Sequence, residues 1–290
     1  MFVDAVKKAA EFTLPVTISS RRYGGAINTG CASYILVNDE GWILTAAHVF
    51  QAAQVAEAHR QAFKSHENQR QAIEQDKLLA SAKKKKVMNR VRLDPNWIQN
   101  HSHWWGQDGV GFENAQLNVL ADIAVARLKG LNIKPDQKFP QFGDPSKRLD
   151  QGHSLCKLGF PFHEIKSTFD DTRNAFVFEP GSLPIPRFPL EGMLTRYANV
   201  QDQNTKAVAL FIEMSTPGLK GQSGGPIFDR DGVVWAIQSQ TRHLPLGFQP
   251  TIEIGTRKTL EYQFLNVGLG AYVSEIAKLF QSAGVKYAVG

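Results

Sequence analysis

The chain is poor in cysteine, with two, Cys31 and Cys156, among 290 residues. Small secreted domains are usually cross-linked by several disulfides, so a scaffold of that kind is excluded. Two free, buried thiols in a reducing compartment are the expectation. The sequence also lacks any apolar run close to the roughly 20 residues that span a bilayer. Charged residues interrupt positions 1–15, which lack the apolar centre of a secretory signal. This favours a cytoplasmic location, with prior removal of a signal as the alternative.

The excess of positive over negative charge is confined to one segment. The net charge of the chain is +6, and residues 51–92 contain ten Lys or Arg and four acids, which give the same excess. The remainder is neutral overall. Hydrophobic residues make up 42% of the chain, enough for a sizeable core, which excludes a disordered or fibrous protein.

Most of the sequence is typical of short strands separated by turns. The Asn-Asp-Glu-Gly turn at 38–41 predicts a hairpin over residues 29–47. Helices are expected near both ends, and residues 168–199 are expected to be irregular because of their prolines. The remaining connections are too short for parallel crossovers, which predicts an antiparallel all-β fold. Strands are expected at 16–20, 117–128, 154–158, 207–214, 227–228, 233–239 and 262–269, and helices at 4–12 and 274–281.

Residues 51–90 differ in kind from the rest. They contain no Gly and no Pro and are rich in Ala, Gln, Glu and Lys, which predicts one long helix. Their apolar positions do not keep to one helical face, so the helix should be poorly buried. We interpret it as an insertion that projects from the core.

A serine between glycines is the first candidate for chemistry. Residues 221–226 read GQSGGP and lie between two expected strands. The glycines allow a tight turn that exposes Ser223 and let a substrate approach closely. The backbone N–H groups of Gly221 and Ser223 would point into one small space, where they could hold the oxygen of a tetrahedral intermediate. A glycine-rich turn with an incidental serine is the alternative.

A serine hydroxyl needs a base to remove its proton, and the base needs an orienting carboxylate. The candidate base is His48, which follows an expected strand and two alanines in LTAAHV. The candidate acid is Asp122, which precedes the apolar run IAVA. Taken singly, His48 could be structural and Asp122 a turn residue or helix cap. In the order His, Asp, Ser they form a catalytic constellation.

These motifs resemble those of trypsin-like serine proteases, particularly the bacterial high-temperature-requirement type. The match lies in LTAAHV at 44–49, DIAV at 122–125 and GQSGGP at 221–226. Supporting likenesses are GCA at 30–32 and LGFP at 158–161. The resemblance covers about residues 16–281, except for the insertion and the proline-rich loops.

The resemblance implies two six-stranded antiparallel β-barrels with the active site between them. An N-terminal helix would occupy 1–15, the first barrel 16–130 with the insertion at about 51–92, the second barrel 131–273, and a C-terminal helix and tail 274–290. It also implies that Ser239 supports the catalytic acid. Ser239, Gln240 and Thr241 would then form the edge strand that pairs with a substrate backbone.

The sequence departs from the family pattern in three places. Gln222 precedes the nucleophile where secreted relatives have an acid that pairs with a newly cut N-terminus, so activity without N-terminal processing is expected. Pro217 occupies the expected base of the specificity pocket, which argues against strict cleavage after Lys or Arg and favours a small or medium apolar side chain. No PDZ-like domain is expected after the last strand.

These features predict a serine endopeptidase that needs no metal or organic cofactor and acts on protein or peptide substrates. The alternative is a catalytically silent binding module of the same fold that acts through the basic insertion. That insertion could bind an acidic partner, nucleic acid or a lipid surface, but a solvated charged helix is the preferred interpretation. His101 and His103 suggest a metal site, but without a third ligand a loop that packs aromatic residues is the preferred interpretation.

Overall fold

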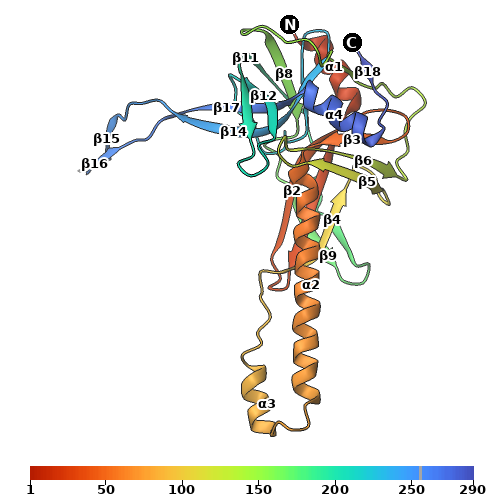
Figure 1. Cartoon of the computed structure of the whole chain (residues 1–290), viewed down its shortest axis with the longest axis vertical. Coiled ribbons are helices and arrows are strands. Elements are labelled where there is room, and N and C mark those ends of the chain that lie inside the picture. Colours follow the sequence, from red (N-terminus) through yellow and green to blue (C-terminus); the bar gives the residue numbers. More distant parts are fainter. Residues whose placement is uncertain (255–256) are drawn as a thin grey trace.

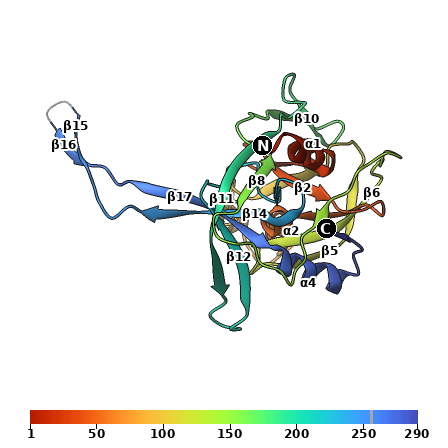
Figure 2. The same ribbon diagram turned by 90° about the horizontal axis from the view of Figure 1, so that it is seen from above.

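The computed structural model describes residues 1–254 and 257–290 (Figure 1). Two antiparallel sheets form the body, and two long extensions leave it in different directions (Figures 1 and 2). One extension is helical and contains α2 (Ala47–Gln75) and α3 (Ser81–Met88); we call it the stalk. The other is a two-stranded ribbon whose tip is β15 (Thr251–Ile254) and β16 (Arg257–Leu260); we call it the arm.

The first sheet has six strands, all joined by antiparallel pairs. In spatial order they are β4 (Ile98–Trp104), β1 (Thr13–Arg22), β2 (Ile27–Leu36), β3 (Trp42–Thr45), β6 (Ile123–Lys129) and β5 (Gly111–Asn118). β3 lies in the interior of the sheet, and all of its residues are buried. The start of α2 follows β3 in the chain and is positioned by it.

Six antiparallel strands of the second sheet form a closed ring. The ring closes because β13 and β14, the strands at its two ends, also pair with each other. The ring runs β13 (Pro226–Phe228), β8 (Ser154–Gly159), β11 (Phe188–Gln201), β12 (Val208–Met214), β17 (Phe264–Tyr272) and β14 (Val234–Pro245). Two short strands, β7 (Gln141–Phe142) and β18 (Ala288–Val289), extend it by parallel pairs. The expected all-β architecture of two six-stranded units is therefore confirmed.

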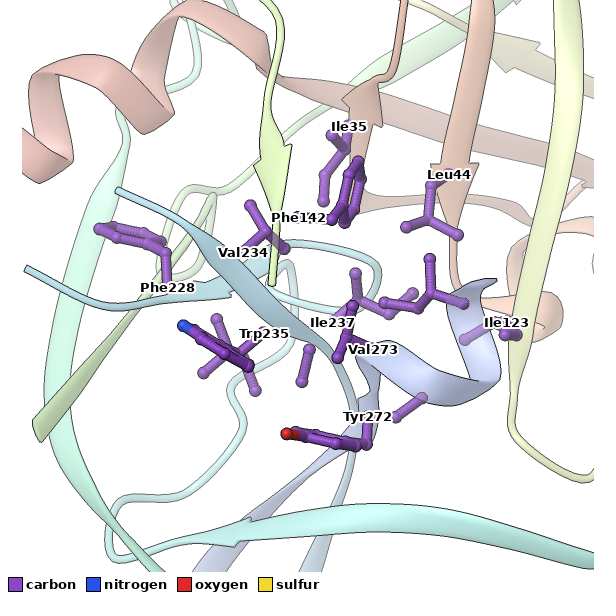
Figure 3. Packing of buried hydrophobic residues seen from close by; sticks show 14 of the residues in the cluster. Ile35, Leu44, Ile123, Phe142, Phe228, Val234, Trp235, Ile237, Tyr272 and Val273 are labelled. Carbon is purple, nitrogen blue, oxygen red and sulfur yellow. The ribbon is translucent and has the colours of Figure 1, made fainter. Parts of the chain in front are cut away.

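Apolar side chains from both sheets form one continuous core where the sheets meet (Figure 3). Ile35, Leu44 and Ile123 come from the first sheet, while Phe142 and Ile237 come from the second, and all five are fully buried. Truncating such a side chain to alanine typically costs about 2–5 kcal/mol. This shared core fixes the position of one sheet relative to the other.

Helices at the two ends of the chain pack against the sheets. In α1 (Val3–Phe12), Ala5, Ala9 and Phe12 are buried. The amphipathic α4 (Val273–Ala283) buries Ile276 and Phe280, and it ends at Gly284 in the left-handed conformation that favours glycine. In the described part of the chain, no helix combines the length and hydrophobicity needed to cross a membrane.

The insertion is a pair of helices rather than the single helix expected over 51–90. The break has a local cause: the Asp76 carboxylate accepts the backbone N–H of Leu78 at 2.8 Å, and this turn competes with helical hydrogen bonds. α2 packs on the rest of the protein up to about His66, which is buried, and Phe63 stacks on Tyr23 at 4.6 Å. No residue of α3 is buried, in agreement with a projecting insertion.

Three other expectations about secondary structure are wrong. Residues 168–199 are not irregular, since they contain most of the hairpin of β9 (Ser167–Asp170) and β10 (Ala175–Phe178) and much of the 14-residue β11. The strand expected at 117–128 is a hairpin of β5 and β6. His101 and His103 lie in β4, which pairs with β1, and not in a loop. Strand pairing decides each of these segments, and composition alone does not report it.

Both thiols are free and lie in different sheets, Cys31 in β2 and Cys156 in β8. Burial raises the pKa of Cys31 to about 12 and that of Cys156 to about 11. Thiols with raised pKa values hold little thiolate at neutral pH, so both are expected to be unreactive.

Candidate active site

His48 and Asp122 meet at one end of the first sheet. His48 lies in the first turn of α2, directly after β3. Its Nδ1 lies 3.1 Å and 3.0 Å from the two carboxylate oxygens of Asp122, and its backbone N–H donates to Asp122 Oδ1 at 3.1 Å. The Asp122 carbonyl in turn accepts the N–H of Ala47 at 3.1 Å. These contacts orient the imidazole and leave its Nε2 edge free for other chemistry.

Asp122 occupies the turn between β5 and β6 in a left-handed conformation, with φ of 51°. Aspartate tolerates this region better than most residues. Its side chain is largely buried, at 16% exposed, whereas that of His48 is 44% exposed. Burial alone would raise the pKa of Asp122, but hydrogen bonds from His48 and Ser239 and the attraction of His48 outweigh it, and the pKa is lowered. Asp122 is therefore an anion at neutral pH.

Ser239 from the second sheet completes the surroundings of Asp122. It lies in β14, and its Oγ donates to Asp122 Oδ2 at 2.7 Å. This hydrogen bond crosses between the sheets and joins residues 117 positions apart in sequence.

We expect Ser239→Ala to lower kcat/KM by about 10-fold, because one charge-assisted hydrogen bond that fixes the Asp122 carboxylate is lost. The measurement is steady-state cleavage of one peptide by both forms. Ser239→Thr, which keeps the hydroxyl, serves as the matched variant and should retain more activity than the alanine form. Equal activity of the wild type and the alanine form would show that this bond does not matter.

The turn that carries Ser223 packs directly against the first sheet. The Ser223 carbonyl accepts the backbone N–H of Ser33 at 2.8 Å. A Cβ added to Gly224 would lie 2.3 Å from the Ser33 carbonyl, 2.4 Å from Thr45 Oγ1 and 2.8 Å from the amide of Ala46. A side chain at Gly224 is therefore sterically excluded. The contacts place Ser223 beside the segment that leads into His48.

The side chains of His48 and Ser223 make no hydrogen bond to each other among the described residues. Hydrogen bonds between catalytic groups are often long in the free enzyme and tighten when substrate binds. The structure thus brings His48, Asp122 and Ser239 into direct contact and puts Ser223 on the adjoining backbone.

Gly221 shapes the backbone in front of Ser223. It has φ of +95°, and a Cβ at this position would lie 2.3 Å from the carbonyl oxygen of Phe160. The Gly221 carbonyl accepts hydrogen bonds from the Phe160 amide at 3.0 Å and from Ser33 Oγ at 2.7 Å. In the described structure, the N–H groups of Gly221 and Ser223 donate to no other protein group. Both donors are available to a developing oxyanion.

Gly221→Ala is expected to reduce kcat by about 10²- to 10³-fold, the typical effect of losing one oxyanion donor. The added methyl group cannot fit against Phe160 without moving the Gly221 peptide. Gly152→Ala is the control, since Gly152 also has positive φ, at +85°, but a Cβ there meets nothing within 4 Å. Comparable activity losses in both variants would attribute the effect to backbone strain in general.

One edge of β14 is free next to this turn. β14 pairs with β13 from Val234 to Ile237 and with β17 from Ala236 to Pro245. Beyond Ile237, the edge opposite β17 has no strand partner in the described part of the chain. The three residues expected to pair with a substrate, Ser239, Gln240 and Thr241, lie at the start of this free edge.

A family model described as trypsin-like peptidase domain matches residues 32–237, more than half of the chain. The chain belongs to the trypsin-like peptidase family. The active form of the Rv3671c protease from M. tuberculosis has a similar fold, with a TM-score of 0.50 and 12% identity over 99% of this chain and 86% of that one. The HtrA-type protease AlgW with a tripeptide has a TM-score of 0.50 and 13% identity over 97% of this chain and 63% of that one, so this chain spans less than two thirds of its length. A comparison with curated protein sequences finds no match.

Two residues of the loop before Ser223, Gln222 and Pro217, distinguish this trypsin-like domain. Gln222 is fully buried, and its side-chain Oε1 accepts the Leu219 amide at 3.1 Å. The loop before Ser223 is therefore held by an uncharged side chain, at the position where an acid is expected only in secreted relatives. Pro217 lies in the same loop, and its carbonyl accepts a hydrogen bond from Lys157 Nζ at 2.6 Å.

Sequence reasoning missed Lys157, Ser33 and Thr45. Lys157 had a visible signal, because it is one charged residue in the otherwise apolar run of β8, where Leu155 and Leu158 are also fully buried. Ser33 and Thr45 had no signal in the sequence that could have identified them. Both contact the Ser223 turn, which lies about 180 residues away in the chain.

The two histidines of β4 do not form a metal centre in the described structure, where no group of three or more potential ligands is found. Burial and the neighbouring His103 lower the pKa of His101 to about 4. His103 Nε2 lies 2.8 Å from the Val49 carbonyl, and its ring stacks on Trp105 at 5.7 Å. His103 thus links β4 to the start of α2, next to His48.

Proposed function

We propose that this trypsin-like domain is a serine endopeptidase in which Ser223 is the nucleophile, His48 the general base and Asp122 the orienting acid. The observation that carries the proposal is the linked set of His48, Asp122 and Ser239, with the Ser223 turn on the adjoining backbone. The partners are peptide or protein substrates. The tripeptide present with the HtrA-type neighbour supports this substrate class.

In the proposed reaction, His48 Nε2 accepts the proton of the Ser223 hydroxyl as Oγ attacks a peptide carbonyl carbon. Asp122 holds the imidazole in the tautomer that carries its proton on Nδ1 and stabilises the imidazolium that forms. The oxygen of the tetrahedral intermediate accepts hydrogen bonds from the Gly221 and Ser223 amides.

Collapse of this intermediate breaks the C–N bond. His48 returns the proton to the leaving amine, and an ester to Ser223 Oγ remains. Water, deprotonated by His48, then hydrolyses the ester and restores the hydroxyl. In this scheme the substrate backbone pairs with the free edge of β14 at Ser239, Gln240 and Thr241, which orients the scissile bond.

A fluorophosphonate probe tests the proposal directly, since it reacts with activated serines. We expect the wild type to be labelled and Ser223→Ala to remain unlabelled, with mass spectrometry locating the adduct on the peptide that contains Ser223. A folded wild-type protein that neither labels nor cleaves any peptide of a diverse library would support the silent binding module instead.

A further inference from the structure

Lys157 is a buried cation behind the loop that precedes Ser223. The residue lies in β8 and is fully buried. Its Nζ donates to the carbonyls of Thr216 at 2.8 Å and Pro217 at 2.6 Å. An ammonium group has three N–H donors, so these two bonds leave one donor unused.

No carboxylate balances this charge within the described structure, where no Asp or Glu lies within ion-pair distance of Lys157 Nζ. Cys156 lies next to it on β8, and Glu191 lies opposite Cys156 on β11. Buried charges in proteins are normally paired, because an isolated ion is costly to remove from water. Two further buried polar atoms in this region, Thr216 Oγ1 and Gln238 Oε1, also have no hydrogen-bond partner among the described residues.

These polar groups converge at Gly268 in β17, which pairs with Thr241 of β14. A Cβ added to Gly268 would lie 3.0 Å from Lys157 Nζ, 3.0 Å from Gln238 Oε1 and 2.8 Å from the Thr216 carbonyl. These distances are too short for a Cβ, so Gly268 is the point where the three groups converge.

The cluster lies where a substrate side chain would arrive. In the proposed reaction, the substrate backbone follows Ser239–Thr241, and its scissile carbonyl faces the Gly221 and Ser223 amides. The side chain on the acyl side of the scissile bond then points between β14 and the loop at 216–220. Thr241 Oγ1 donates to the Gly218 carbonyl at 2.6 Å, so the two walls touch in the free protein and this hydrogen bond must open for the side chain to enter. Lys157 Nζ is bonded to the same loop on its buried side.

We propose that the Lys157 ammonium group binds the side-chain carboxylate of the residue on the acyl side of the scissile bond, so that the enzyme prefers Glu or Asp there. The inference rests on the proposed function and makes the specificity of the site more precise. It replaces the apolar preference suggested by Pro217 alone, because the deep wall behind Pro217 is polar and positively charged.

Matched peptide pairs that differ by Glu or Gln, and by Asp or Asn, at this position measure the contact. For the wild type at pH 6 we expect, in at least one pair, that the peptide with the acidic residue has a kcat/KM about 10- to 100-fold above that of the peptide with the amide. This factor corresponds to the free energy of one hydrogen bond between charged groups. Comparable rates for acid and amide in both pairs would overturn the proposal.

Two lysine variants locate the origin of any preference. Lys157→Met keeps the length of the side chain and removes a buried charge, a change that is often neutral or stabilising; it should abolish the preference. Lys220→Met removes the exposed lysine beside Gly221 and should retain it. Loss of the preference in Lys220→Met, or its persistence in Lys157→Met, would contradict the proposal.

The pH dependence of the wild type gives a test that needs no variant. Burial lowers the pKa of Lys157 to about 7. The charged fraction of Lys157 therefore falls as the pH rises through 7, while the substrate carboxylate stays ionised. The acid-to-amide ratio should decline between pH 6 and pH 9, because pH effects common to both peptides cancel in the ratio. A constant ratio over this range would contradict the proposal.

Binding separates this inference from the peptidase proposal. Calorimetry with Ser223→Ala and the same peptides reads the contact without turnover. If the acid peptides bind more tightly and no form of the protein cleaves them, the carboxylate site stands and the peptidase proposal fails. If cleavage occurs without preference for acids, the peptidase proposal stands and the assignment of Lys157 fails.

Discussion

Replacing Ser223 with alanine is expected to lower kcat by about 10⁶-fold, as found when the nucleophile of a comparable triad is removed. The variant loses the only atom that can form the ester in the proposed reaction. Its backbone N–H remains, so oxyanion stabilisation and substrate binding should leave residual catalysis of about 10³–10⁴-fold over water. Peptide cleavage followed over several days, with the enzyme in excess, measures rates this slow.

The same experiment with His48→Ala tests whether the two residues act as a unit. Without its base the hydroxyl is a poor nucleophile, so the single His48 variant should be nearly as slow as Ser223→Ala. The double variant should then be no slower than either single one. A double variant whose loss is the product of the two single losses would show that His48 and Ser223 act independently, contrary to the proposed mechanism.

Thermal unfolding provides the control for these variants. Both positions are partly exposed and contribute little to the core, so Tm should change by no more than a few degrees. A Tm of Ser223→Ala far below that of the wild type would attribute the loss of activity to misfolding.

A core variant should behave differently from these surface variants. Ile237→Ala, in the shared core of Figure 3, is expected to lower the free energy of unfolding by about 2–5 kcal/mol.

The local part of the site could be predicted from sequence because each motif carries its own structural reason. The turn at 221–226 requires glycine at three positions where the structure leaves no room for a Cβ, Gly221, Gly224 and Gly225. His48 follows a fully buried strand, and Asp122 precedes a strand whose first four residues are buried. Such short-range features determine which residues lie at the ends of strands. The site is built from residues at these strand ends.

The environment of the site could not be predicted, because it depends on register and long-range packing. Lys157 reaches the carbonyls of Thr216 and Pro217 across 59 and 60 positions of sequence. Nothing local specifies which of the strands beside β8 brings that loop within reach. A charged residue inside an apolar strand indicates only that some partner exists.

The two extensions show the same limit. Helix propensity correctly marks the stalk as helical, but it does not show that the Asp76 side chain ends α2 through a turn with Leu78. For the arm, β17 is expected at 262–269 and observed at Phe264–Tyr272, and β14 continues six residues beyond Ser239. Because β14 and β17 support each other in a ribbon away from the body, the arm depends on cross-strand pairing rather than on burial (Figure 2).

Asp122→Asn is the second variant with a large expected effect, a decrease of about 10⁴-fold in kcat. Asparagine has almost the same size and tolerates the left-handed conformation at φ 51°, so the turn between β5 and β6 should be retained. Its amide can donate a hydrogen bond to His48 Nδ1, which would place the imidazole proton on Nε2. The ring could then no longer accept the proton of Ser223. Activity of Asp122→Asn within 10-fold of the wild type would refute the orienting role of Asp122.

The pH dependence of stability tests the same carboxylate without reference to activity. Because the folded state lowers the pKa of Asp122, its ionised form is favoured by folding. This stabilisation is complete above the unfolded pKa of about 3.9, and it is lost as the pH falls through the lower folded value. The Tm of the wild type should therefore exceed that of Asp122→Asn most clearly above about pH 5, and the gap should narrow toward pH 2. A gap that is independent of pH would mean that packing, and not the charge held between His48 and Ser239, accounts for the stability provided by Asp122.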